Sequence, residues 1–415
     1  RKDHPLFASR LRQATKKGAK VMSVHALRDD WLMPMGPSIA AAPGAWASTL
    51  ASIASALAVA KGVSAPVDAP VDDQARNIAA ALQGGERKAV LFGNAAAQHP
   101  EAALLERLGR WIAEQSGATF GWLVDGANSV GAQLVGAMPR AGGMNAARML
   151  GAEAPLKAAI LLNVEPELDL ANPPAALAAL GGAEMVVALT SFKPIDDIAD
   201  VLLPIAPFTE TSGTFINAEG RVQSFHGVVK PLGDARPAWK VLRVLGNLLG
   251  LPGFSAETSE EVRDEALGDL STLASRLAPS ATTPVEPMPI SLVPAAAGLE
   301  RIADVPIYAT DAIVRRAPAL QHTADAHAPV AGVPSELAAE LGIVDGSHVR
   351  VSQGETSVVL TARVDPSLAA NVIRVAAGHR LTAALGPMFG ALRIELAAGA
   401  DATSVARSSP EASPT

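Results

Sequence analysis

Apolar runs alternate with segments of helical periodicity along the first 250 residues. Short apolar runs predict strands, and the segments between them carry apolar residues at every third or fourth position, which predicts helices such as 100–114. The predicted strands span 88–92, 118–123, 157–163, 184–189 and 201–205. Because strands that alternate with helices usually pair in parallel, this pattern predicts a largely parallel sheet covered by helices on both faces.

One stretch is apolar enough to be mistaken for a membrane span. Residues 38–60 carry no charge, but alanine and serine dominate them and Pro43 interrupts them. Trp46, Leu50, Ile53 and Leu57 fall at helical spacing on one face. We therefore expect the core helix of a globular domain here.

The most distinctive local sequence pattern lies between Thr209 and Leu249. Residues 214–216 and 221–225 predict two strands, and Asn217 and Gly220 between them suit the first and last positions of a tight turn. A helix is predicted after Pro237, with apolar residues on one face until Gly250. The pattern therefore predicts a β-hairpin followed by an amphipathic helix.

Beyond residue 305 the chain is expected to be mostly strand. Short strands over 348–352, 356–364 and 372–375, separated by glycine turns, predict a small closed barrel. The fold class is therefore α/β, with parallel Rossmann-like layers followed by a small C-terminal β-barrel. The expected parts are a truncated α/β unit (1–64), a main α/β domain (65–250), an acidic helix with a Pro-rich linker (251–304), the barrel (305–398) and a flexible tail (399–415).

Composition excludes several classes of site. The chain has 415 residues, a net charge of −7 and no long basic run, so nucleic acid is a poor partner. It has no cysteine, which excludes disulfides and thiolate ligation of zinc or iron–sulfur clusters by this chain. Its eight histidines are scattered, so no metal site is expected. His226 and His379 are the two whose positions would suit a site, although a structural role is favoured for both.

The predicted hairpin resembles a signature of the molybdopterin oxidoreductase family, E-x-x-G-T-x-x-N-x-E-G-R-x-Q. Two further segments add to the resemblance: the strand A-D-V-L-L-P over 199–204 and the pattern N-x-x-G-A-x-x-x-G-x-x-P that begins at Asn128. The family's motif positions are Asn128, Gly131, Gly213, Thr214, Asn217, Glu219, Gly220, Arg221 and Gln223. In that family the C-terminal domain is a double-psi barrel that holds one end of the pterin dinucleotide.

Longer segments of the sequence resemble one branch of this family, the molybdopterin-oxidoreductase-like subunit of bacterial NADH:quinone oxidoreductase (respiratory complex I). GANSVGAQLVGAMP from residue 126 and SGTFINAEGRVQSFHGVVKPLGDARPAWKVLRVLGN from residue 212 are similar to that branch, and the resemblance covers nearly all of residues 1–400. It implies a non-catalytic scaffold with no catalytic residue, no metal ligand and no bound molybdopterin in this segment. The motif positions would then be vestigial, and the iron–sulfur clusters would lie in an upstream part of the protein.

The same resemblance implies that the chain's partners are other subunits of the complex I hydrophilic arm. The expected location is peripheral, on the cytoplasmic side of the bacterial inner membrane, with no membrane insertion of this segment. The chain opens with a helix before its first strand, so we expect sequence upstream of residue 1. Two alternatives stay open: a fragment of a catalytic molybdopterin enzyme such as a formate dehydrogenase or nitrate reductase, and a free-standing binding module.

Overall fold

The computed structural model describes residues 3–140, 142–151, 155–193, 198–277, 291–293 and 297–397. The chain divides into two compact units. Unit 1 comprises Arg1–Leu123, Ala171–Pro173 and Glu286–Thr415, and unit 2 comprises Val124–Leu170 and Pro174–Val285. The Pro-rich linker at 281–290 and the tail over 399–415 lie outside the described residues. The domain boundaries expected from the sequence stay predictions.

The N-terminal part of unit 1 alternates strands and helices, as the hydrophobic pattern predicts. Its elements are α1 (Pro5–Thr15), β1 (Ser23–His25), β2 (Ser38–Ala40), η1 (Pro43–Ala45), α2 (Trp46–Lys61), α3 (Asp73–Gln83), β3 (Ala89–Phe92), α4 (Asn94–Ala97), α5 (Ala102–Ser116) and β4 (Thr119–Trp122). β1 pairs with β2 and β3 pairs with β4, both in parallel. The parallel strands therefore form two short pairs in this part of the chain.

Helix α2 has the burial expected of a core helix. Pro43–Lys61 is long and apolar enough to cross a membrane by length and composition, but ten residues of α2 are buried in the structure. Ile53 and Leu57 pack with α3 and α5 in one apolar cluster. The helix ends at Gly62, whose φ of +67° is readily adopted by glycine.

The C-terminal part of unit 1 is a closed barrel. Its described strands are β10 (Leu299–Ile302), β11 (Val330–Val333), β12 (His348–Gln353), β13 (Thr356–Val364), β14 (Val372–Arg374) and β15 (Phe389–Leu396), in the order β10-β14-β11-β13-β12-β15. Pairing of β10 with β15 closes the ring. The fold class predicted from the sequence, parallel α/β layers followed by a small β-barrel, is confirmed.

Two features of this region were not predicted from the sequence. Residues 307–326 form short helical turns, namely η4 (Ile307–Ala309), α13 (Ala312–Arg315), α14 (Pro318–Gln321) and η5 (Ala324–Ala326). The Asp311 carboxylate caps α13 by accepting from the amides of Ile313 and Val314, which favours a helical turn. The first barrel strand, β10, also starts before residue 305, inside the stretch expected to be a linker. α15 (Ser335–Leu341) lies between β11 and β12 in the sequence.

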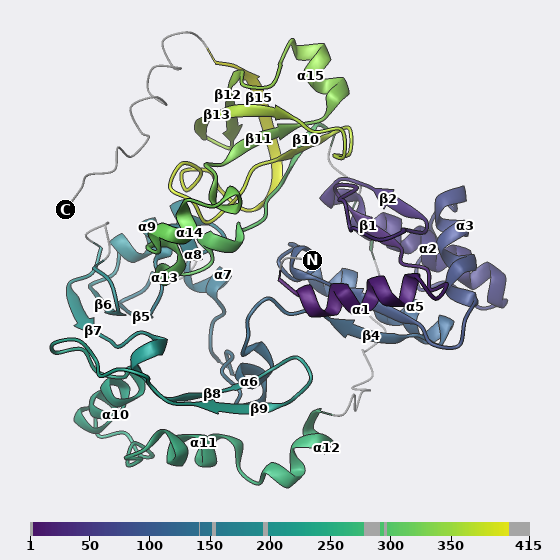
Figure 1. Ribbon diagram of the computed structural model, residues 1–415. Helices are drawn as coiled ribbons and strands as arrows, with labels where there is room; N and C mark the ends of the chain where they lie inside the picture. The colour runs from purple at the N-terminus through teal and green to yellow at the C-terminus, as the bar shows by residue number, and fades with distance from the viewer. Residues whose placement is uncertain are drawn as a thin grey trace. The chain divides into compact units, whose positions relative to one another are not determined.

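Unit 2 contains a parallel sheet and the predicted hairpin. Its elements are α6 (Ser129–Leu134), α7 (Ala146–Met149), β5 (Ala158–Leu162), α8 (Pro166–Asp169), α9 (Pro173–Gly181), β6 (Met185–Thr190), β7 (Val201–Pro204), η2 (Phe208–Glu210), β8 (Gly213–Ile216), β9 (Val222–Phe225), α10 (Ala238–Leu248), α11 (Ser259–Leu267), η3 (Leu270–Thr272) and α12 (Leu273–Leu277). The sheet has the order β5-β6-β7, with both pairs parallel. β8 and β9 form a separate antiparallel pair (Figure 1).

Candidate functional site

The family-motif residues of the hairpin lie on β8, on the turn and on β9. Gly213 and Thr214 open β8, where the Thr214 hydroxyl lies 3.0 Å from the Ser224 hydroxyl across the strand pair. Phe215 and Phe225 meet edge to face on the same hairpin, with their ring centroids 5.2 Å apart. A two-stranded ribbon is marginally stable alone, and these contacts across it add to its stability.

The turn is held by the side chain of Asn217. Its Oδ1 accepts hydrogen bonds from the amides of Glu219 (3.0 Å) and Arg221 (2.9 Å), and the Gly220 amide donates to the Asn217 carbonyl (2.8 Å). Gly220 has a φ of +79°, which glycine adopts without steric cost. Asn217 and Gly220 therefore hold the turn, as predicted from their positions in the sequence.

The other charged motif residues lie at the surface. Glu219, Arg221 and Gln223 are exposed, and the structure forms no ion pair between Glu219 and Arg221 in the described part of the chain. Glu219 and Arg221 carry opposite charges but do not pair with each other in the described part of the chain. Residues two apart across such a turn need not face each other, and the amide of Arg221 bonds instead to Asn217.

The structure joins the two motifs that the sequence predicts separately. Asn128 stands at the N-cap position of α6, and its Oδ1 accepts a 2.8 Å hydrogen bond from the amide of Ile216 in β8. Ile216 is 2% exposed, so this bond satisfies a buried amide 88 residues away in the sequence. Sequence reasoning found both motifs but not this contact, because the distance along the chain gives no local signal.

The motif glycines face the chain's own side chains. A Cβ at Gly131 would overlap the carboxamide of Asn128, and one at Gly220 would overlap Leu277. A Cβ at Gly213 would stand 2.7 Å from Cζ of Phe225. Each of these spaces is thus filled by internal packing, and these three positions by themselves offer no open cradle for a pterin.

The segment directly after β5 has an unusual backbone conformation. Asn163, directly after β5, has a φ of +54°, and its amide donates to the Leu189 carbonyl at 2.7 Å. A non-glycine residue in this conformation is uncommon and marks a locally constrained backbone.

Among the described residues no group of three or more histidine, aspartate and glutamate side chains could hold a metal ion.

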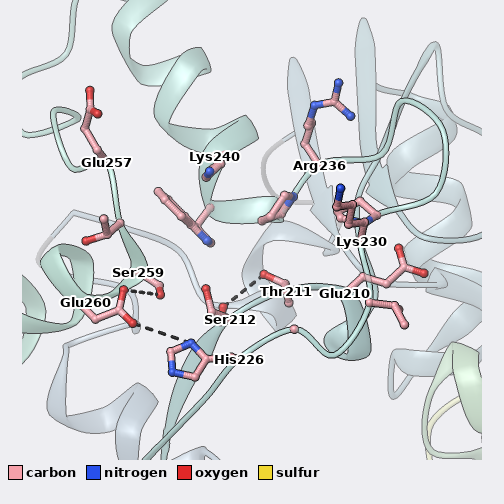
Figure 2. A pocket seen from close by; sticks show the side chains of 16 residues that line it. Glu210, Thr211, Ser212, His226, Lys230, Arg236, Lys240, Glu257, Ser259 and Glu260 are labelled. Carbon is pink, nitrogen blue, oxygen red and sulfur yellow. Dashed lines mark hydrogen bonds and ion pairs between the residues drawn. The ribbon is translucent and has the colours of Figure 1, made fainter.

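The two histidines singled out in the sequence have different surroundings. His379 in unit 1 accepts a hydrogen bond from the Leu381 amide at Nδ1 (3.1 Å), and burial lowers its pKa. His226 in unit 2 follows the hairpin and lies 4.0 Å from a carboxylate oxygen of Glu260. It lines a cavity of about 670 Å³, shown in Figure 2, whose walls come from residues on either side of the hairpin, the following loop, the start of α10 and residues 257–260.

Known proteins resemble this chain at two levels. Formate dehydrogenases of Staphylococcus aureus, so named provisionally in strains USA300 and NCTC 8325, are each 40% identical to it over 67 residues. That match spans 16% of this chain and 7% of each relative, so the chain matches a small part of their length. The fold is similar to that of acetylene hydratase from Pelobacter acetylenicus, with a TM-score of 0.57, 14% identity, and coverage of 94% of this chain and 75% of that one.

The family assignment rests on a longer match. The profile of the molybdopterin oxidoreductase family matches residues 1–248, which is more than half of the chain and includes both motifs that Asn128 joins. The chain belongs to the molybdopterin oxidoreductase family.

Proposed function

We propose that this chain is a structural part of an oxidoreductase of its family, in the role that the resemblance to bacterial NADH:quinone oxidoreductase implies. One observation carries the proposal: the two motif asparagines and the glycines at 131, 213 and 220 contact other groups of the same chain. Asn128 and Asn217 bond to backbone amides, and Gly131 faces a side chain at the start of its own helix. These residues therefore hold the hairpin against α6.

The second candidate is a catalytic molybdopterin enzyme of the formate dehydrogenase kind. The provisional names of the curated relatives favour it, and none of the relatives named above is a complex I subunit. The comparisons thus support this candidate more than the first, although the match covers 67 residues. A bound molybdenum or tungsten pterin would supply the redox chemistry in such an enzyme.

Metal analysis of the full-length protein separates the two candidates. The structural role predicts far less than one molybdenum or tungsten atom per chain and no pterin fluorescence after acid oxidation. It also predicts co-purification with NADH-oxidising and quinone-reducing subunits. Stoichiometric molybdenum or tungsten with a bound pterin would overturn the structural role and establish the catalytic one.

Glu219→Gln also tests whether the hairpin has a structural or a catalytic role, because it removes the charge and keeps the size of the side chain. The Glu219 side chain is exposed and bonds to no group among the described residues, so its loss should leave the fold unchanged. In the structural role, quinone reduction by the assembled complex stays nearly unchanged. A large loss of turnover with normal assembly would point to a catalytic site at the hairpin.

A further inference from the structure

The core helix of unit 1 begins without a capping side chain of its own. η1 and α2 form one continuous helix, Pro43–Lys61, and the residue before it, Ala42, has no side-chain oxygen. The first turn of a helix leaves backbone amides without acceptors, and a serine, threonine, aspartate or asparagine at the cap usually satisfies one of them. This helix end therefore depends on an acceptor from elsewhere in the protein.

The acceptor is the side chain of Glu300 on strand β10 of the barrel, which belongs to the same unit. Its Oε2 accepts a 2.7 Å hydrogen bond from the Gly44 amide, in the first turn of the helix. A Cβ at Gly44 would stand 2.9 Å from the other oxygen, Oε1, so the carboxylate lies directly over the helix end. The positive end of the helix dipole stabilises an anion at this place.

This carboxylate is buried without a cationic side chain beside it. Glu300 is 5% exposed, and its Oε1 is buried with no hydrogen-bond partner among the described residues. The Gly44 amide is the one donor that the carboxylate meets in the described part of the chain. A buried carboxylate costs free energy unless a partner stabilises its charge, so the helix end takes the place of a cation here.

The start of this helix lies where parallel α/β structures bind their ligands. β2 pairs in parallel with β1, and its carboxyl end leads through residues 41–42 into η1. Ligands of such sheets lie beyond the carboxyl ends of the strands, with anionic groups at the N-terminus of the following helix. In this chain Trp46 packs there against Ile302 and Phe389 of the barrel. The barrel therefore fills the place from which an external ligand would approach.

The turn that presents the Gly44 amide is held by contacts that do not involve the barrel carboxylate. The Trp46 indole Nε1 donates to the Ala41 carbonyl at 2.9 Å. The ring Nε2 of His99 lies 3.1 Å from the Pro43 carbonyl. The amide should therefore keep its direction when the carboxylate is removed, and the helix end is preorganised for an anion.

We propose that the N-terminus of the η1–α2 helix is a carboxylate-binding site, and that Glu300 of the same chain is its ligand. The barrel delivers the anion, and the Gly44 amide and the helix dipole hold it. The site accepts a small free carboxylate once this side chain is shortened. Glu300→Ala leaves a space that matches acetate, which supplies the two carbons and two oxygens that the substitution removes. The inference is independent of the proposed function, because both candidates contain unit 1.

Thermal unfolding of the full-length protein with added acetate tests the site. Tryptophan fluorescence reports on unit 1, which contains four of the five tryptophans. At neutral pH, sodium acetate at about 100 mM should raise the melting temperature of Glu300→Ala by about 2–4 °C relative to sodium chloride at equal concentration. Acetamide, which has the shape of acetate without its charge, should leave that melting temperature unchanged. If Glu300→Ala folds poorly, acetate and not acetamide should raise the yield of soluble protein.

Two proteins serve as controls for the acetate response. The wild-type protein has its site filled, so acetate and chloride should give the same melting temperature. Glu355→Ala removes an exposed carboxylate at the turn between β12 and β13 of the same barrel, and it should not respond to acetate either.

A second substitution tests the contact without any added ligand. Gly44→Ala places a methyl group against the Glu300 carboxylate, so it should lower the melting temperature of the wild-type protein. In the Glu300→Ala background the carboxylate is gone, and the same change should leave the melting temperature unchanged or raise it, because alanine favours a helix more than glycine does.

Two outcomes would overturn the proposal. The first is a Glu300→Ala protein that responds to acetate no more than to acetamide, because the helix end would then have no preference for an anion. The second is a Gly44→Ala substitution that lowers the melting temperature equally in both backgrounds, because the carboxylate would then not lie over the Gly44 amide.

Discussion

The barrel of unit 1 and the β8–β9 hairpin of unit 2 are both β structures, but their polar side chains have opposite surroundings. In the barrel, Arg301 on β10 is 1% exposed, whereas Glu219 and Arg221 at the hairpin turn are exposed. The barrel closes on itself, and Arg301 is buried among carbonyls from distant parts of the chain. The hairpin has two strands and relies on single side-chain bonds to its backbone. Polar residues such as Arg301 and Asn217 thus have structural roles in both places. Burying the charged guanidinium costs far more desolvation free energy than keeping an amide side chain near water.

The Arg301 guanidinium is the largest polar group inside the barrel. It donates to the carbonyls of Val375, Ala376, Gly386 and Pro387 and to the side chain of Gln353, at 3.0–3.4 Å. Burial lowers its pKa to about 10, so it stays charged at neutral pH. No carboxylate contacts it among these bonds, and its charge is stabilised by carbonyl dipoles alone.

Removing this group should have the largest effect. Arg301→Met leaves several buried acceptors without donors and should lower the free energy of unfolding by about 3–5 kcal/mol. Urea denaturation followed by circular dichroism measures the change. Arg363→Met, at an exposed position of β13, is the control and should cost less than about 0.5 kcal/mol. Equal losses in the two variants would contradict the role of the buried network.

The hairpin turn is expected to be the next most sensitive. Gly220→Val strains a backbone with φ of +79° and places a Cβ against Leu277, so it should cost about 1–3 kcal/mol. Gly250→Val is a matched control, since Gly250 has a φ of +67° and no atom within 4 Å of a Cβ. The control carries the strain without the overlap, so it should unfold at higher urea concentration than Gly220→Val. The reverse order would show that Leu277 yields easily.

A smaller loss should follow from cutting the bond between the two motifs. Asn128→Ala leaves the buried Ile216 amide unpaired and should cost about 1–2 kcal/mol in urea denaturation. Asn217→Ala serves as the comparison, because the amides it releases lie in an exposed turn and can bond to water. If the two variants are equally stable, the Asn128 bond adds nothing beyond the turn.

The pH dependence of unit 1 should show the smallest effect. His99 is 6% exposed, its Nε2 lies 3.1 Å from the Pro43 carbonyl, and its Nδ1 accepts from the Glu101 amide. Burial lowers its pKa, so the unfolded chain takes up the proton first as the pH falls below about 6.5. Stability is therefore fully present above that pH and falls below it.

His99→Gln removes this titration. Thermal unfolding between pH 5 and 7.5 should show a shallower loss of stability toward acid in the variant. The difference in slope between the two proteins should be less than about 1.4 kcal/mol per pH unit, the value that the uptake of one proton can give. His25 and His379, whose pKa values burial also lowers, remain in both proteins and contribute to the residual slope. An unchanged slope would mean that His99 is protonated equally in both states.

Much of the fold follows from the sequence because its signals are local. The residues of β12 alternate between buried and half-buried positions, as their apolar alternation predicts, and α2 buries the face that Trp46 and Ile53 mark. β10 could not be predicted in this way. Glu300 and Arg301 read as surface residues, yet both are buried because their partners lie elsewhere in the chain.

The features of the candidate site likewise fall into those that local residue types predict and those that depend on distant residues. The turn at Asn217 and Gly220 follows from residue types with local conformational preferences. The Asn128–Ile216 bond and the packing of Leu277 on Gly220 depend on residues far away in the sequence. The cavity beside His226 has no sequence signature, because its lining combines residues on either side of the hairpin, the following loop, the start of α10 and residues 257–260.

The carboxylate of Glu300 has a consequence for how the protein is made. It accepts a 2.7 Å hydrogen bond from the Gly44 amide, next to the start of α2, across 256 residues of sequence. The same core joins Trp46 and Phe92 to Ile302 and Phe389. At about 5–20 residues per second on the ribosome, the N-terminal helices wait tens of seconds for the barrel that completes their core. During that interval their apolar faces are a natural substrate for chaperones.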